Sequence, residues 1–246
     1  MESEAQFSYG IVPDTHGQYE KVGRMLDILD PFVDKILFLG DVIDGPDSKR
    51  LIQLIRSLGD KAITIVGNHE WVCRNAMADY DDVNTRIWRE HMWPLYEDRL
   101  LVSYGINKTG DWDYNALAIR EIMQENGDYE WINSLPPYYE TYEFVALHAG
   151  PKSNILWTDQ KSFLNMVSSA KKRHSIEPEQ IFSGEIANTQ IVPNDTANRV
   201  FISGHAHSST PASHRMRNKR ICLASNISNG DPLFVWLSSQ NEIVSF

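Results

Sequence analysis

Cysteine is scarce in this chain of 246 residues, in which Cys73 and Cys222 are the only two. Two thiols provide neither a disulfide framework nor a cysteine-rich zinc site. The chain also lacks any apolar run near the roughly 18 residues that a membrane-spanning helix needs. Its opening segment, MESEAQFSYG, carries acidic residues where a signal peptide would carry basic ones. We therefore expect a reduced, cytoplasmic protein with no membrane partner.

Basic residues are outnumbered, because 23 Lys and Arg stand against 33 Asp and Glu and give a formal net charge of −10. A protein that binds long nucleic acids needs a positive face, so this balance argues against such a partner. An acidic protein can still bind phosphate esters when metal ions supply positive charge locally. The remaining composition, 42% hydrophobic and 23% charged, is typical of a globular chain. We expect residues 1–246 to form a single α/β domain.

Apolar runs in the first quarter of the chain predict strands that alternate with helices. The runs at 7–12, 35–39 and 62–66 are typical of buried strands, and helical spacing of apolar residues covers 18–29 and 48–58. Strands separated by helices imply parallel pairing with right-handed crossovers.

The middle of the chain, 71–137, is dense in aromatic and charged residues and predicts a helical cap or insertion. Strand patterns then return, and we expect strands at 143–147, 199–202, 220–223, 233–237 and 242–246. Few helical windows separate the last three, so we expect them to pair as antiparallel hairpins. The sequence thus predicts an α/β fold with mixed sheets.

Polar residues stand beside glycines at the ends of five expected strands. Loops at the carboxyl ends of strands converge in open α/β sheets, so we expect these side chains to meet. Imidazole, carboxylate and amide donors without a thiolate suit divalent ions such as Mn²⁺, Zn²⁺ or Fe²⁺. The candidate ligands are Asp14, His16, Asp41, Asn68, His148, His205 and His207. Seven ligands are too many for one ion, whereas two ions about 3.5–4 Å apart that share a carboxylate would use them all.

The five strand-end motifs resemble, in the same order, those of the calcineurin-like metallophosphoesterase superfamily. They are DTHG at 14–17, GDVIDG at 40–45, GNHE at 67–70, HAG at 148–150 and GHAH at 204–207. The resemblance implies a sandwich of two mixed β-sheets flanked by helices. Within the superfamily, the segments DTHGQY, GDVIDGPDS and ILWTDQ look like those of serine/threonine phosphoprotein phosphatases and symmetrical dinucleoside tetraphosphatases.

This resemblance also implies a role for each motif residue. The first metal ion would be held by Asp14, His16, Asp41 and His207. Asp41 would bridge to a second ion, which is completed by Asn68, His148 and His205. His69 would stabilise the transition state or protonate the leaving alkoxide, and Asp44 would orient His69. We expect Mn²⁺ as the activating ion, with Zn²⁺, Fe and Ni²⁺ as alternatives.

Three positions depart from the two phosphatase groups. No arginine stands between Asp44 and Gly45, where those enzymes carry the one that holds the substrate phosphate. Pro13 replaces a glycine, and His207 is a second histidine that phosphoprotein phosphatases lack. Arg74 and Asn226 are our candidate substrate contacts, with a surface ion pair as the alternative for Arg74. The basic run at 215–220 predicts a solvated hairpin, with recognition of an anionic substrate as the alternative.

These features predict a hydrolase, namely a binuclear metal-dependent phosphatase. A hydroxide that bridges two ions would attack phosphorus in line with the leaving oxygen. Its substrate would be a phosphomonoester, on a phosphoprotein or a small molecule, or a nucleotide polyphosphate. The paired His205 and His207 keep a phosphodiesterase or nuclease open as an alternative. A non-catalytic interaction module on the same fold is a third reading, against which the retention of His69 argues.

Overall fold

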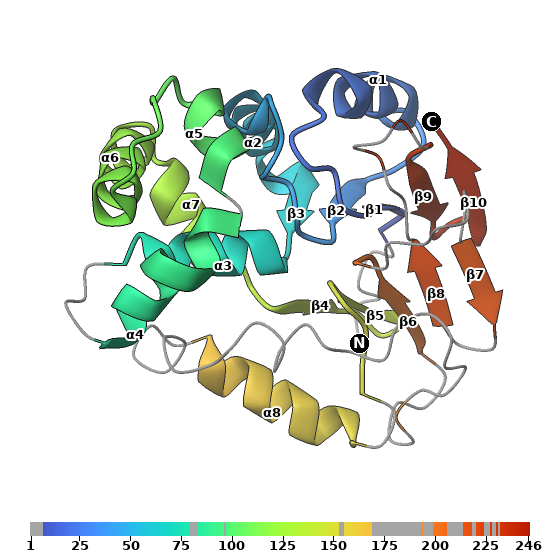
Figure 1. The fold of residues 1–246 in the computed structure, drawn as a ribbon. Coiled ribbons are helices and arrows are strands. Elements are labelled where there is room, and N and C mark those ends of the chain that lie inside the picture. Colours follow the sequence, from blue (N-terminus) through green and yellow to red (C-terminus); the bar gives the residue numbers. More distant parts are fainter. Residues whose placement is uncertain are drawn as a thin grey trace.

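Two five-stranded β-sheets packed face to face form the centre of the computed structural model (Figure 1). The structure describes residues 7–78, 83–95, 97–152, 155–168, 193, 199–205, 214–217, 220–223, 227, 230 and 232–246. The space between the sheets is filled by an apolar cluster that includes Ile11 and Leu37 from one sheet and Phe144 and Ile202 from the other. Within these described ranges, no helix is both long enough and apolar enough to cross a membrane.

The first sheet has the strand order β10-β9-β1-β2-β3. Its strands are β1 (Tyr9–Val12), β2 (Lys35–Phe38), β3 (Ala62–Thr64), β9 (Phe234–Leu237) and β10 (Glu242–Ser245). The first three are parallel and are joined through α1 (Tyr19–Leu29) and α2 (Ser48–Ser57), as the apolar pattern predicts. Strand β9 runs antiparallel to both β1 and β10. The predicted β-α-β-α-β beginning is confirmed.

The second sheet has the order β4-β5-β6-β8-β7. Its strands are β4 (Tyr138–Glu140), β5 (Phe144–Leu147), β6 (Val200–Ser203), β7 (His214–Arg217) and β8 (Arg220–Leu223). Strands β5, β6 and β8 are parallel, and β4 and β7 are antiparallel edges. The prediction that 220–223 pairs with 233–237 is wrong, because β8 and β9 lie in different sheets. Strand β8 instead forms a hairpin with β7, in the basic run at 215–220 where we expected a hairpin but assigned no strand to 214–217.

Helices fill the segment between β3 and β4 and gather on one side of the sheets (Figure 1). They are α3 (Asn68–Ala76), α4 (Val83–Ile87), a π-helical turn (Trp88–Met92), a 3₁₀ turn (Trp93–Leu95), α5 (Glu97–Ser103), α6 (Trp112–Glu125) and α7 (Asp128–Ser134). This confirms the helical insertion, while its treatment as part of a single domain over 1–246 stays a prediction. A 3₁₀ turn at Gly59–Lys61 precedes β3, and α8 (Trp157–Val167) packs on the outer face of the second sheet.

A buried ion pair ties the insertion to the sheet-covering helices. The Asp128 carboxylate at the start of α7 is fully buried and pairs with Nη1 of Arg56 on α2. The hydroxyl of Tyr104, just beyond α5, donates a hydrogen bond of 2.8 Å to the other oxygen of Asp128. One carboxylate therefore connects α2, α5 and α7.

We expect Asp128→Asn to lower the free energy of unfolding by about 2–4 kcal/mol, because it removes the buried negative charge that pairs with the partly buried guanidinium of Arg56. Urea unfolding followed by circular dichroism measures this change. The control is Asp30→Asn, which removes an exposed pair with Lys61 and should cost less than about 1 kcal/mol. If both variants lost the same free energy of unfolding, the buried Asp128 ion pair would contribute no more to stability than the exposed one.

Candidate metal centre

The predicted ligands meet at the carboxyl ends of β1, β2, β5 and β6 and at the first turn of α3. Six of the seven lie among the described residues, and His207 lies outside them. Groups of ligand atoms all within 4.8 Å of one another are formed by Asp14, His16 and Asp41, by Asp41, His148 and His205, and by His16, Asp44 and His69. Asp41 and His16 each belong to two of these groups, and Asp41 is the residue that links the ligands after β1 to those after β5 and β6.

Two buried carboxylates dominate the charge of this site. Asp14 and Asp41 are 3% and 2% exposed. The Asp41 Oδ2 atom lies 3.3 Å from Nε2 of His148, and both Asp14 oxygens accept from the His205 backbone N–H at 3.1 and 3.2 Å. Among the described residues, the ion-pair partners of both carboxylates are histidines and never Lys or Arg. Buried carboxylates without permanent cations are costly, so this donor set fits divalent metal ions.

His148 presents one ring nitrogen to the other ligands. Its Nδ1 lies 2.7 Å from the Leu39 carbonyl oxygen, so Nδ1 carries a hydrogen and donates it. Its Nε2 lies 2.8 Å from Oδ1 of Asn68 and 3.0 Å from Nδ1 of His205. Burial would lower the pKa of His148, but the neighbouring carboxylates, chiefly that of Asp41, raise it to about 10. A cation at Nε2 would therefore have to displace a proton there.

Backbone conformation at the site is unusual. His16, Asp41, Asp44 and His205 have positive φ angles of 41°, 49°, 66° and 62°. Non-glycine residues rarely adopt this left-handed region, and such residues concentrate where function requires it. Gly67 is required for a different reason, because a Cβ atom there would lie 2.1 Å from Oδ1 of Asp41. The strand-end glycines thus give the loops room to bring the carboxylates together.

The Glu70 side chain binds the backbone of the Asp41 loop, a role that we did not predict from the sequence. It is fully buried and accepts hydrogen bonds of 2.8–3.1 Å from the backbone N–H groups of Asp41, Val42, Ile43 and Gly67. The sequence signal was available, since Gly67 is the N-cap of α3 and Glu70 stands at its third helical position, from which its side chain accepts from the Gly67 N–H. These four hydrogen bonds hold the backbone of the loop that carries Asp41.

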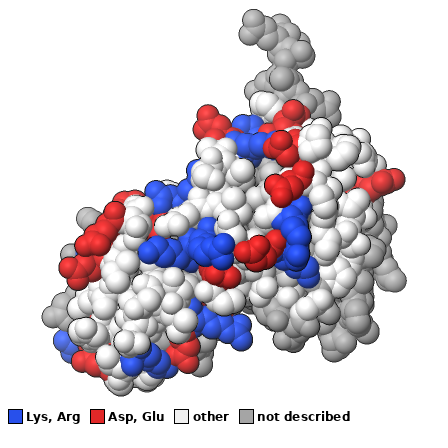
Figure 2. Space-filling model, turned by 90° about the horizontal axis from the view of Figure 1, so that it is seen from above, with Lys and Arg blue, Asp and Glu red and all other residues white. Residues whose placement is uncertain are grey.

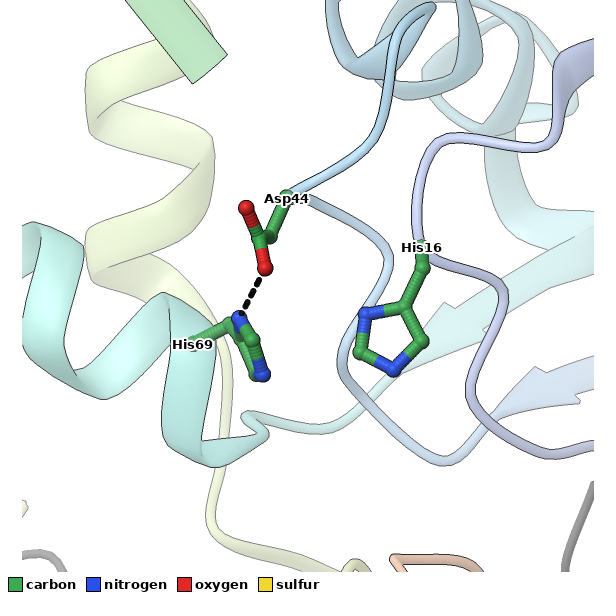
Figure 3. A group of neighbouring side chains, drawn as sticks. All are labelled: His16, Asp44 and His69. Carbon is green, nitrogen blue, oxygen red and sulfur yellow. Dashed lines mark ion pairs between the residues drawn. The ribbon is translucent and has the colours of Figure 1, made fainter. Parts of the chain in front are cut away.

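His69 and Asp44 form a pair beside the carboxylate cluster (Figure 3). The Nδ1 atom of His69, at the start of α3, lies 3.2 Å from Oδ2 of Asp44, on the loop after β2. His16 comes from the loop after β1, and its ring centroid lies 4.9 Å from that of His69. Burial would lower the pKa of His69, but the carboxylates, Asp41 first and then Asp44, raise it above its ordinary value. The 3.2 Å contact is suited to a proton on Nδ1 that faces the Asp44 carboxylate.

The candidate substrate contacts fare differently. Arg74 is 1% exposed and its guanidinium lies 4.1 Å over the Trp71 ring, so the alternative of a surface ion pair is wrong. A contact from Arg74 to substrate stays a prediction, and Asn226 lies outside the described residues.

The basic run at 215–220 is only partly described. The backbone of 214–217 forms β7, but nothing can be said of its side chains. Arg220 is 4% exposed, and its guanidinium lies against Gly150, where a Cβ atom would meet Nη2 at 2.6 Å. For Arg220 the expectation of a solvated side chain is wrong, because it is buried under the loop after His148.

Comparison with known proteins agrees with the geometry. Residues 7–209 match the family described as calcineurin-like phosphoesterase. Over 62 residues the chain is 39% identical to the symmetrical bis(5'-nucleosyl)-tetraphosphatase of Methylococcus capsulatus, which is 24% of this chain and 22% of that protein. The protein of the same name from Aeromonas salmonicida is also 39% identical over 62 residues, or 24% and 23% of the two chains. The match therefore spans under a quarter of the length of these relatives.

Solved structures show the same fold. A putative diadenosine tetraphosphatase superposes with a TM-score of 0.60 at 16% identity, covering 99% of this chain and 94% of that one. A protein serine/threonine phosphatase from Saccharomyces cerevisiae gives a TM-score of 0.56 at 16% identity, covering 100% and 81%. At such low identity these likenesses establish the architecture and leave the substrate to the site itself.

Proposed function

The chain belongs to the calcineurin-like phosphoesterase family, a family of hydrolases of phosphoester bonds, and we propose that it is a binuclear metal-dependent phosphatase. The observation that carries the proposal is the convergence of carboxylate and imidazole groups around Asp41, beside a histidine that is paired with Asp44. We propose phosphomonoesters or nucleotide polyphosphates as its substrates.

Each ion would have its own set of ligands. The first would be held by Asp14, His16, Asp41 and His207, and the second by Asp41, Asn68, His148 and His205. The ligand groups support this division, since Asp41 is shared between a group from β1 and a group from β5 and β6. The two ions would supply a hydroxide nucleophile at neutral pH and positive charge for the phosphoryl oxygens. We propose Mn²⁺ as the ion for assays, with Zn²⁺, Fe and Ni²⁺ as alternatives, because imidazole and carboxylate donors suit all of these ions.

His69 would act on the leaving group. Its Nδ1 faces the Asp44 carboxylate at 3.2 Å, so a second proton on Nε2 is free to pass to the leaving alkoxide. The neighbouring carboxylates, Asp41 first and then Asp44, raise the pKa of His69 and so favour its protonated form. The charged ring would also stabilise negative charge on the phosphoryl oxygens. Asp44 would position the ring and maintain its charge.

The relatives support a nucleotide substrate. Two relatives that are 39% identical over 62 residues are named symmetrical bis(5'-nucleosyl)-tetraphosphatases, and the matched segments cover under a quarter of their length. We therefore include diadenosine tetraphosphate beside simple esters as a substrate to be tested.

We expect the Mn²⁺-loaded protein to hydrolyse p-nitrophenyl phosphate faster than bis-p-nitrophenyl phosphate. Release of p-nitrophenol measures both rates, and EDTA should abolish them because the site relies on metal charge. Preference for the diester would move the protein to the phosphodiesterases, the alternative that the missing arginine after Asp44 favours. No turnover of either ester with any of the four metals, or turnover that survives EDTA, would contradict the proposed function.

A further inference from the structure

A groove opens between helix α5 and the loops that follow β1 and β2. Its volume is about 430 Å³ and the described residues that line it are Gln18, Pro46, Asp98, Arg99 and Val102. This volume falls within the roughly 300–1,000 Å³ of small-molecule sites. One wall belongs to the helical insertion and the other to the two loops that carry His16 and Asp44.

The loop wall of the groove adjoins the metal centre. Gln18 is two residues from His16, and Pro46 is two residues from Asp44. Residues two positions apart have Cα atoms within about 7.6 Å of each other, so this limit holds for Gln18 and His16 and for Pro46 and Asp44. The two loops also touch directly, since a Cβ atom on Gly45 would lie 1.7 Å from the His16 carbonyl oxygen. The loop wall of the groove is therefore formed by the same two segments that carry His16 and Asp44.

Arg99 gives the groove its positive charge. It is the only cation among the described lining residues, its side chain is exposed, and none of the ion pairs between described residues includes it. The neighbouring acid, Asp98, is paired with Lys108, so its charge is offset. Val102 is 69% exposed and adds an apolar surface to the same wall.

The charge around this groove suits a short polyanion. On the face seen from above, the acidic and basic side chains of the described residues are interspersed and neither sign forms a broad patch (Figure 2). A long polyanion such as a nucleic acid would need a continuous positive surface. A single guanidinium can hold one phosphate through two parallel hydrogen bonds. One arginine beside an apolar wall fits a phosphate with an organic group attached to it.

We propose that Arg99 binds a substrate phosphate other than the one that is attacked, so that the substrate class is a polyphosphate ester whose far end lies in the α5 groove. This proposal rests on the proposed function, because it needs one phosphate at the metal centre. Val102 would pack against the organic group.

The first test is direct binding. Diadenosine tetraphosphate is titrated calorimetrically into Mn²⁺-loaded His69→Asn protein, in which turnover is slow, with and without Arg99→Ala. We expect Arg99→Ala to weaken binding 10-fold or more, because it removes a charged hydrogen-bond partner, and Arg99→Lys to recover part of that loss. The control is Arg24→Ala, an exposed arginine on α1, which should leave the affinity unchanged.

The second test separates this proposal from the proposed function. In the otherwise native protein, Arg99→Ala should raise KM for diadenosine tetraphosphate about 10-fold and change kcat/KM for p-nitrophenyl phosphate less than twofold, since the latter has one phosphate. Equal effects on both substrates, no effect on either, or no binding of diadenosine tetraphosphate at all would overturn the role of Arg99. Absence of p-nitrophenyl phosphate turnover by the native protein would instead overturn the proposed function.

Discussion

Replacing His69 with Asn is expected to lower kcat about 10²–10⁴-fold while the metal content stays the same. Loss of a positioned general acid typically has an effect of this size. His69 is not among the proposed ligands, and its ring nitrogen faces the Asp44 carboxylate at 3.2 Å. Steady-state rates with p-nitrophenyl phosphate and metal analysis of the same sample measure the two quantities. Unchanged turnover by the metal-loaded variant would show that His69 has another role.

Asp44→Asn is the companion variant, and its effect should appear in the pH profile. Asp44 is one of the carboxylates that raise the pKa of His69. An acid must be protonated to act, so activity falls as the pH rises through this pKa. Removing the Asp44 charge lowers the pKa and should move the alkaline limb of the kcat profile to lower pH. A variant with reduced kcat and an unshifted limb would limit Asp44 to a structural role.

Replacing Glu70 with Gln is expected to weaken metal binding about 10–100-fold, the usual cost of losing a group that supports a metal ligand. The Glu70 carboxylate accepts from four backbone N–H groups around Asp41. The NH₂ group of Gln would face some of these donors and leave them unsatisfied, which also costs about 1–3 kcal/mol of stability. Isothermal titration with Mn²⁺ measures the affinity, and urea unfolding measures the stability.

Glu125→Gln provides the matched control for Glu70→Gln. Glu125 is exposed at the end of α6, far along the chain from the ligand loops. The same change of charge there should leave both metal affinity and stability close to those of the native protein. If Glu70→Gln also binds Mn²⁺ normally, the backbone of Asp41 does not depend on this carboxylate, and our account of the loop is wrong.

The sequence predicts the strands that are buried and apolar. Runs such as KILFL at 35–39 and EFVAL at 143–147 indicate β2 and β5, because parallel strands covered on both faces are continuously apolar. The edge strands β4 (YYE) and β7 (HRMR) are not among the strands expected from the sequence, since their residues are largely polar or amphipathic. For β7 the sequence predicts only the hairpin at 215–220. Pairing of β8 with β7 and β6 depends on which sheet receives the chain, and local periodicity carries no information on that.

The candidate site follows the same division. Ligand residues at strand ends are predictable because topology alone brings those ends together. The burial of Arg74 and Arg220 could not be predicted from the sequence, because arginine side chains are mostly exposed. Their surroundings come from tertiary packing, Trp71 for one and Gly150 for the other. The α5 groove likewise joins segments about 80 residues apart, Gln18 and Arg99, that no motif connects.

The central claim is that Asp41 is shared by two metal ions, and metal counting tests it most directly. Protein equilibrated with Mn²⁺ and freed of excess by gel filtration is analysed by inductively coupled plasma mass spectrometry. We predict two Mn²⁺ per chain for the native protein and fewer than one for Asp41→Asn, because the shared carboxylate serves both ions. One ion per chain in the native protein, or two in Asp41→Asn, would contradict a binuclear centre built around Asp41.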